Sequence, residues 1–248
     1  MLNNIWNRRS FIGRTAIGAG AVIGGSTAIE LLSTTRVWAA ADGHDGEILN
    51  FALTLEYLEA TFYQRGNASN VITDSREQEI FATIQKDEEA HVQALTDTLN
   101  KLGVKPVRKP TVNFPAGTFA SRESYLKLAM VFENTGVGAY LGQAGSITNK
   151  DILAAAAGIF GIEARHAALI GVISGAVPEG GIYKGATETP IAKGAVLAAV
   201  MPFLGGMPNT GFAPAQQSTN LLPAGLAIGG LAAALVALRT RGSRRTPQ

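Results

Sequence analysis

Cysteine is absent from the 248 residues of the chain. This absence excludes disulfide bonds, iron–sulfur clusters and zinc sites built from thiolates. Charged residues are also scarce, at 16% of the chain, whereas hydrophobic residues make up 46%. The chain therefore has enough apolar side chains for a substantial core and for membrane contact near its ends.

The body of the chain lacks an excess of positive charge. Four arginines and one glutamate lie within residues 1–41, and four arginines with no acidic residue lie within residues 239–248. Between these ends, residues 42–238 contain 13 basic and 18 acidic residues. An acidic body with basic ends does not predict binding to nucleic acid.

The basic N-terminal segment, residues 1–41, resembles an export signal. Arg8 and Arg9 are followed by Ser-Phe-Ile, as in the twin-arginine signals of bacteria, and then by a weakly apolar stretch rich in Gly, Ala and Ile. Ala39 and Ala41 offer small residues for a signal peptidase. We expect the twin-arginine export machinery to be a partner, and the alternative is a membrane helix that stays in place.

Two Glu-x-x-His motifs lie in the body of the chain. Glu88 precedes His91 by three residues, and Glu163 precedes His166 by three. On an α-helix such pairs share one face, and here that face is the apolar stripe that should point to a core. A buried carboxylate without a partner is costly. A metal ion is the simplest partner, because Glu oxygens and His nitrogens are ligands of first-row metals.

Hydrophobic periodicity predicts three long helices, over residues 45–65, 75–102 and 150–173. Gly66 with its neighbour Asn67 is expected to end the first of them. Residues 103–120 hold three prolines and predict a long crossover. A further helix should follow Ser121 as its N-cap, although its second half is Gly-rich and each interior Gly costs about 1 kcal/mol relative to Ala.

The four predicted helices form two similar pairs. Glu56 precedes Tyr63 by seven residues, and Glu133 precedes Tyr140 by seven, with 77 residues between the two copies. The two Glu-x-x-His motifs are 75 residues apart. Such an internal repeat supports the Gly-rich third helix, because that helix occupies the place of the first in the second copy.

Glu59 is an alternative to Glu56, since it also lies near the apolar face of the first helix. The repeat favours Glu56 as the ligand, because Gly136 stands where a second copy of Glu59 would lie. Glu59 is therefore expected beside the ligands. Asp87 is expected on a solvated face, and Arg165 is expected either to pair with a nearby acid or to be exposed.

The charges of the four predicted glutamates fit a pair of ions. Four carboxylates carry a charge of −4, and two divalent ions would balance it. Without cations these acids would repel one another and take up protons. Six protein ligands shared by two ions leave coordination positions for water, oxygen species or substrate.

The acidic residues and histidines of the repeat resemble the di-metal carboxylate site of the ferritin-like superfamily, a four-helix bundle with one long crossover. The stretches LNFALTLEYLEATFY and DEEAHVQAL are closer still to an exported ferritin-like group that includes desiccation-related proteins. The resemblance covers about residues 44–173. It implies iron or manganese as the metal, and it implies as ligands Glu56, Glu88, His91, Glu133, Glu163 and His166.

The same resemblance implies that Tyr63 and Tyr140 orient ligands through hydrogen bonds. A homo-oligomer is a further expectation. Two features depart from the better-known members of the superfamily. The absence of cysteine excludes a rubredoxin-like electron carrier, and the C-terminal third does not resemble a cage subunit, which argues against iron storage.

The C-terminal third predicts an extension and an anchor. Residues 176–220 are rich in Gly and Pro, with a short apolar segment at 191–204 expected to pack on the bundle. Residues 221–238 contain no charge and reach the lower limit for a membrane span of about 30 Å. The arginines that follow should keep the tail of 221–248 cytoplasmic. Upstream, Met-Pro-Asn-Thr210-Gly211 resembles a sortase signal, with Met in place of the usual Leu.

These observations predict an all-α protein whose residues 42–175 form a ferritin-like four-helix bundle, with an apolar C-terminal tail helix. The protein is expected at the outer face of the cytoplasmic membrane or in the cell wall, through the membrane segment or a sortase. Two divalent ions would support redox chemistry, either metal oxidation or peroxide handling. The alternative is a non-catalytic, stress-protective or structural bundle whose metal only staples the core.

Overall fold

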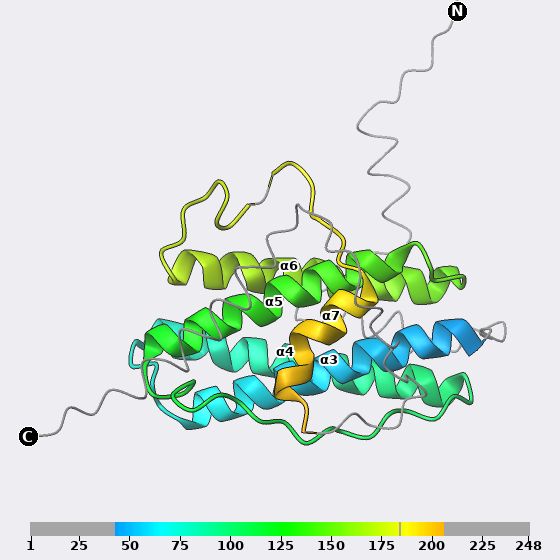
Figure 1. Ribbon diagram of the computed structural model, residues 1–248, viewed down its shortest axis with the longest axis horizontal. Helices are drawn as coiled ribbons and strands as arrows, with labels where there is room; N and C mark the ends of the chain where they lie inside the picture. Colours follow the sequence, from blue (N-terminus) through cyan, green and yellow to red (C-terminus); the bar gives the residue numbers. More distant parts are fainter. Residues whose placement is uncertain (1–42, 184, 206–248) are drawn as a thin grey trace, which may run out of the picture.

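Four long helices lie side by side in the computed structural model, which describes residues 43–183 and 185–205 (Figure 1). They are α3 (Gly43–Ala68), α4 (Ser75–Lys101), α5 (Arg122–Ala144) and α6 (Lys150–Ile173). α3 packs mainly against α4, and α5 packs mainly against α6. The described part of the chain is therefore the four-helix bundle that the sequence predicts.

A short helix, α7 (Lys193–Val200), and a 3₁₀ turn, η1 (Met201–Phe203), follow the bundle, and α7 packs against α5 (Figure 1). Val196, Val200 and Phe203 are buried in the core, which confirms the expected apolar segment. The predicted signal with its processing residues, the sortase-like motif at Thr210 and the apolar run 221–238 lie outside the described residues.

Side-chain caps explain where three of the helices begin. Asp74 accepts a hydrogen bond from the backbone N–H of Glu77, and Asn149 does the same for the first turn of α6. Ser121 caps α5 as predicted and forms a reciprocal capping box with Ser124. These caps satisfy N–H groups that have no partner within the helix.

The prediction that Gly66 ends the first helix is wrong, because α3 continues to Ala68. A Cβ at position 66 would lie 2.2 Å from the ring of Tyr125 on α5. Gly66 therefore marks a close approach between an aromatic ring and the helix backbone. The Gly-rich end of α5 has a similar cause, since a Cβ at Gly142 would lie 2.1 Å from the carbonyl oxygen of Ile191.

The long crossover between α4 and α5 is held along the bundle by backbone contacts. The Asn50 side chain accepts a hydrogen bond from the N–H of Val107 and donates one to the carbonyl of Lys105. Farther along, Val112 forms an antiparallel β-bridge with Leu204, just after η1. The crossover is thereby held against α3 and the segment that follows α7.

The two ends of the bundle have different cores. Aromatic side chains fill the end where α3 finishes and α5 begins: Phe62, Tyr63, Phe81, Tyr125 and Phe132. Aliphatic side chains fill the end where α3 and α6 begin, among them Leu49, Leu53, Leu95, Ile152 and Ile159. Buried glutamates and histidines occupy the intervening turns of all four helices.

One described helix, α6, is long and apolar enough to cross a membrane by length and composition. In the bundle its buried face holds Glu163 and His166 together with Ile152, Ile159 and Ile170. α6 thus serves as a core helix in the described structure.

Candidate metal centre

All six residues predicted as ligands meet inside the bundle. α3 contributes Glu56 and α5 contributes Glu133, whereas α4 and α6 each contribute a Glu-x-x-His pair. The four glutamates have no exposed surface, and the two histidines are 5% exposed. Side chains from four separate helices therefore converge on one buried volume.

The ligand atoms divide into two overlapping groups of four. One group comprises Glu56, His91 and the pair Glu88 and Glu163; the other comprises Glu133, His166 and the same pair. Within each group the atoms lie within 4.8 Å of one another. The two groups therefore share two glutamates, and each group adds one further glutamate and one histidine.

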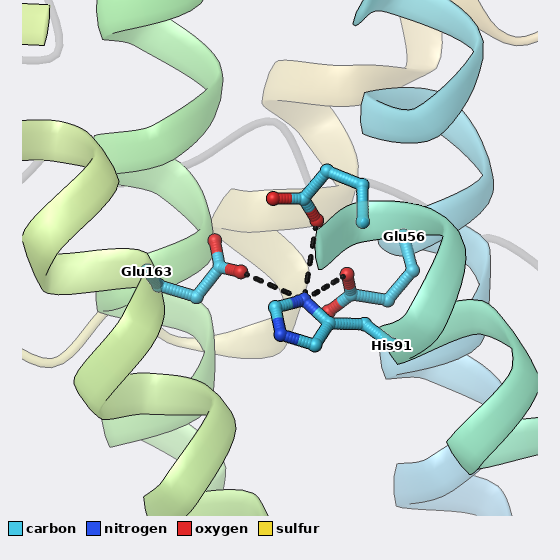
Figure 2. A group of neighbouring side chains, drawn as sticks. Glu56, His91 and Glu163 are labelled. Carbon is cyan, nitrogen blue, oxygen red and sulfur yellow. Dashed lines mark hydrogen bonds and ion pairs between the residues drawn. The ribbon is translucent and has the colours of Figure 1, made fainter. Parts of the chain in front are cut away.

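Both imidazoles present Nδ1 to the cluster. His91 Nδ1 lies 3.2 Å from Glu56 Oε2, 3.3 Å from Glu88 Oε2 and 3.3 Å from Glu163 Oε1 (Figure 2). His166 Nδ1 lies 3.0 Å from Glu88 Oε1 and 3.4 Å from Glu133 Oε2. Each histidine thus faces the glutamate that belongs to its own group alone, Glu56 or Glu133, and at least one of the two shared glutamates.

Several atoms of the cluster are buried without a hydrogen-bond partner. They include Glu133 Oε2, Glu88 Oε1, both carboxylate oxygens of Glu163 and His166 Nδ1. Glu88 Oε1 and His166 Nδ1 are close enough for an ion pair but do not form a hydrogen bond. Buried polar atoms are nearly always satisfied, so this concentration of unsatisfied oxygens and nitrogen fits metal ions as the partner.

Burial shapes the electrostatics of the metal-free cluster. Desolvation raises the pKa of Glu56 to about 7, although His91 opposes the shift. Desolvation and the charge of Glu88 raise the pKa of Glu163 well above its usual range. Burial also acts on Glu88, but the nearby imidazoles of His166 and His91 outweigh it and lower its pKa. The cluster therefore retains protons that divalent cations would displace.

Glu56 and Glu133, the two glutamates that belong to one group each, accept a hydrogen bond from a tyrosine of the other repeat. The hydroxyl of Tyr140 donates to Glu56 Oε1 at 2.5 Å, and the hydroxyl of Tyr63 donates to Glu133 Oε1. In each case the other carboxylate oxygen faces a histidine of the cluster. Both tyrosines therefore hydrogen-bond to glutamates of the cluster, and their role in orienting metal ligands stays a prediction.

Asp87 contacts the cluster, contrary to the expectation that it lies on a solvated face. Its Oδ2 is 3.2 Å from Nε2 of His166, while its side chain remains 37% exposed. A carboxylate in this position fixes the ring so that Nδ1 points to the ligands. The local sequence gives no signal for this contact, because it depends on where α6 places His166. Arg165 is exposed, as one of the two expectations for it stated, and donates to the carbonyl of Gly161.

Glu59 lies beside the ligands, as expected, and is 3% exposed. Burial, followed by the charge of Glu163, raises its pKa well above the usual range, and its Oε2 has no hydrogen-bond partner. A Cβ at Gly136 would lie 2.5 Å from Glu163 Oε2 and 3.3 Å from Glu59 Oε1. The glycine in the second repeat therefore makes room for two carboxylates.

A cleft of about 280 Å³ leads from the surface to the cluster between α4 and α6, and its lining mixes charged side chains with the apolar Ile80, Ile84, Ile162 and Leu169. Its lining includes Asp87 and His166 at the cluster and Arg76, Glu79 and Arg165. Arg76 pairs with Glu79 at 3.1 Å. The His166 side of the cluster is thus the side that polar molecules can approach.

A bundle of this topology with a buried carboxylate–histidine cluster is compatible with a metal site and defines the chain as ferritin-like. A family model for the ferritin-like domain matches residues 44–176, more than half of the chain. The chain therefore belongs to the ferritin-like domain family. No protein among those with curated functions matches it.

Proposed function

We propose that the cluster binds two divalent ions, iron or manganese, and reacts with dioxygen or peroxide. The observation that carries this proposal is the pair of four-residue ligand sets that share Glu88 and Glu163. The unsatisfied oxygens of the same residues support it. The absence of cysteine leaves oxygen and imidazole ligands, which suit both metals.

The residues would divide their tasks between the two ions. Glu56 and His91 would hold one ion, Glu133 and His166 the other, and the shared carboxylates would bridge them. Tyr140 and Tyr63 would keep the terminal carboxylates turned toward the ions, and Asp87 would do the same for one imidazole. Because these orienting groups are buried or packed, the ligands need little rearrangement on binding.

When bound, such an ion pair supplies one electron per ion, so that dioxygen with two protons leaves as hydrogen peroxide, or peroxide with two protons leaves as two waters. Negatively charged carboxylates favour the higher oxidation states of the ions. The buried position of the cluster excludes bulk water, and the cleft at His166 provides a path for protons and polar species.

Metal content tests the assignment directly. The full-length chain, purified from its own host, should hold close to two ions of iron or manganese, measured by elemental analysis. Glu163→Gln and His166→Ala should each remove at least one ion. Glu89→Gln is the matched control, because Glu89 neighbours Glu88 but is exposed and bonded to Gln64. Full occupancy in a Glu163→Gln/His166→Ala double variant would contradict the assignment.

The proposal includes location: an exported protein held at the cell surface. The twin-arginine pair at Arg8 and Arg9, the acidic body and the apolar run 221–238 before a basic end support it. Whether the anchor stays or is replaced by a sortase linkage after Thr210 depends on processing. Mass spectrometry of the mature C-terminus distinguishes the two.

A second candidate function, a protective bundle in which bound metal only stabilises the core, is favoured by one observation. The ligands come from all four helices, so bound ions would cross-link the whole core. Metal-loaded protein of this kind would be strongly stabilised but would not turn over Fe(II) or peroxide. Measured turnover above the rate of free metal ions would exclude it.

A further inference from the structure

The inference rests on the proposed function and concerns how the oxidant reaches the ions. The two repeats place similar ligands on both sides of the cluster, but the two ends of the bundle beyond it differ. On one side the aromatic rings of Phe62, Phe81 and Tyr125 pack around Tyr63, with ring centroids 5.0 to 6.4 Å apart within this group of four. Tyr63 has no exposed surface, so these rings close the path past Tyr63, and the cleft at this end reaches the cluster only at His166, between α4 and α6.

Beyond Tyr140 the bundle contains a cavity of about 20 Å³. All four helices line it, chiefly with aliphatic side chains, among them Ala52, Leu55, Leu95, Ala155 and Ile159. Tyr140 also lines the cavity and is 8% exposed. The surroundings of the two repeated tyrosines therefore differ: Tyr140 borders an apolar cavity, whereas Tyr63 is packed among aromatic rings.

The cavity lies within one helical turn of three predicted ligands. Ala52 is four residues before Glu56, Leu95 is four residues after His91, and Ile159 is four residues before Glu163. Residues four apart stack on the same face of a helix. Tyr140 closes the remaining side and donates its hydroxyl hydrogen bond to Glu56.

We propose that this cavity binds dioxygen and delivers it to the ion held by Glu56 and His91. A volume of this size accommodates about one water-sized molecule, and an apolar lining disfavours water because it offers too few hydrogen-bond partners. Dioxygen is small and apolar, and it needs no such partners. Hydrogen peroxide is polar and enters by the cleft at His166, on the opposite side of the cluster.

Xenon tests the cavity without depending on metal or turnover. Metal-free, full-length protein with labelled methyl groups is placed under xenon pressure and observed by NMR. The methyl signals of Leu55, Leu95 and Ile159 should shift with xenon pressure, and those of Leu126 and Leu128 in the aromatic half should not. No shift in the first group, or equal shifts in both, would overturn the proposal.

A filling substitution provides the second test. Ala155→Val should abolish the xenon shifts with little change in the melting temperature, because the added methyl groups enter existing space. Ala129→Val is the matched control: Ala129 is fully buried in the cluster that contains the aromatic rings. It should lower the melting temperature and leave the xenon shifts unchanged. Xenon shifts that persist in Ala155→Val would place the gas elsewhere.

Rates distinguish this inference from the proposed function itself. In Fe(II)-loaded protein, Ala155→Val should slow oxidation by dioxygen several-fold and leave oxidation by hydrogen peroxide unchanged. Equal rates of the variant and the parent with dioxygen would refute delivery through the cavity. A parent protein that binds no metal would refute the proposed function, while the xenon shifts would still decide whether the cavity takes an apolar gas.

Discussion

Removal of the metal should reverse the way in which the stability of the protein depends on pH. In the metal-free bundle, burial raises the pKa of Glu56 from 4.5 to about 7. Between these values the unfolded chain has lost the proton that the folded chain still holds. The stabilisation of the fold by protonated Glu56 is therefore complete below pH 4.5 and is lost as the pH rises through 7.

The size of the effect follows from the shift. One pKa unit corresponds to about 1.4 kcal/mol, so the shift of Glu56 alone removes about 3 kcal/mol as the pH rises from 4.5 to above 7. The carboxylates near His91 and His166 raise the pKa of both imidazoles, against the effect of burial. Their stabilisation is complete below pH 6.5 and declines as the pH rises from there towards the raised pKa values, so they act in the same direction.

Bound ions act in the opposite direction. Ligands must lose their protons to bind metal, so metal affinity and the stabilisation that it provides increase with pH. Melting temperatures measured from pH 5 to 8 should therefore fall in chelator-treated protein, by about 6–12 °C for a loss of 3 kcal/mol, and stay level or rise in metal-loaded protein. Parallel curves for the two forms would refute the reasoning.

Three further predictions concern a ligand, the packing and the location. Glu56→Gln should remove at least the ion that Glu56 would hold, and Glu59→Gln should weaken metal binding only modestly, as measured by elemental analysis. Gly66→Ala should lower the free energy of unfolding by about 1–3 kcal/mol in urea titrations, because its Cβ would overlap an aromatic ring. Replacing Arg8 and Arg9 by lysine should retain the protein inside cells, which fractionation would detect.

Each of these three predictions has a control or an outcome that would contradict it. The opposite order of effects at Glu56 and Glu59 would show that the repeat misidentifies the ligand. Gly43→Ala should leave stability unchanged, because no atom lies within 4 Å of the added Cβ. Deleting residues 212–248 should release the body into the medium. A body that resists protease until intact cells are lysed would contradict export.

The sequence was sufficient to predict the four helices and the convergence of the six predicted ligands, because hydrophobic periodicity marks three of the helices and the internal repeat supports the remaining one. The end of the first helix was mispredicted, since Gly66 combines a helix-breaking tendency with a contact to Tyr125 that no local pattern encodes. The persistence of α5 despite its glycines has the same origin. Close packing between helices determined these features, and it involves residues far apart in the chain.

Asp87 shows why part of the site was missed. It lies next to Glu88, so on its own helix it points about 100° away from the ligand face. Only the position of His166 on the neighbouring α6 brings it within reach. Glu59 could be placed near the cluster from its helical position, but the space that it occupies depends on Gly136 of α5.

The reciprocal tyrosine contacts have a consequence for how the two repeats are joined. Residues 43–101 alone contain Tyr63 but not its partner Glu133, and two identical copies of such a half could satisfy each other's contacts as a symmetric pair. In a symmetric pair every position would be the same on both sides. Linking the halves through the crossover removes that constraint, so Glu59 can stand in one half and Gly136 in the other. Under the proposed function, a single chain would thereby give its two ions unequal surroundings and unequal reduction potentials.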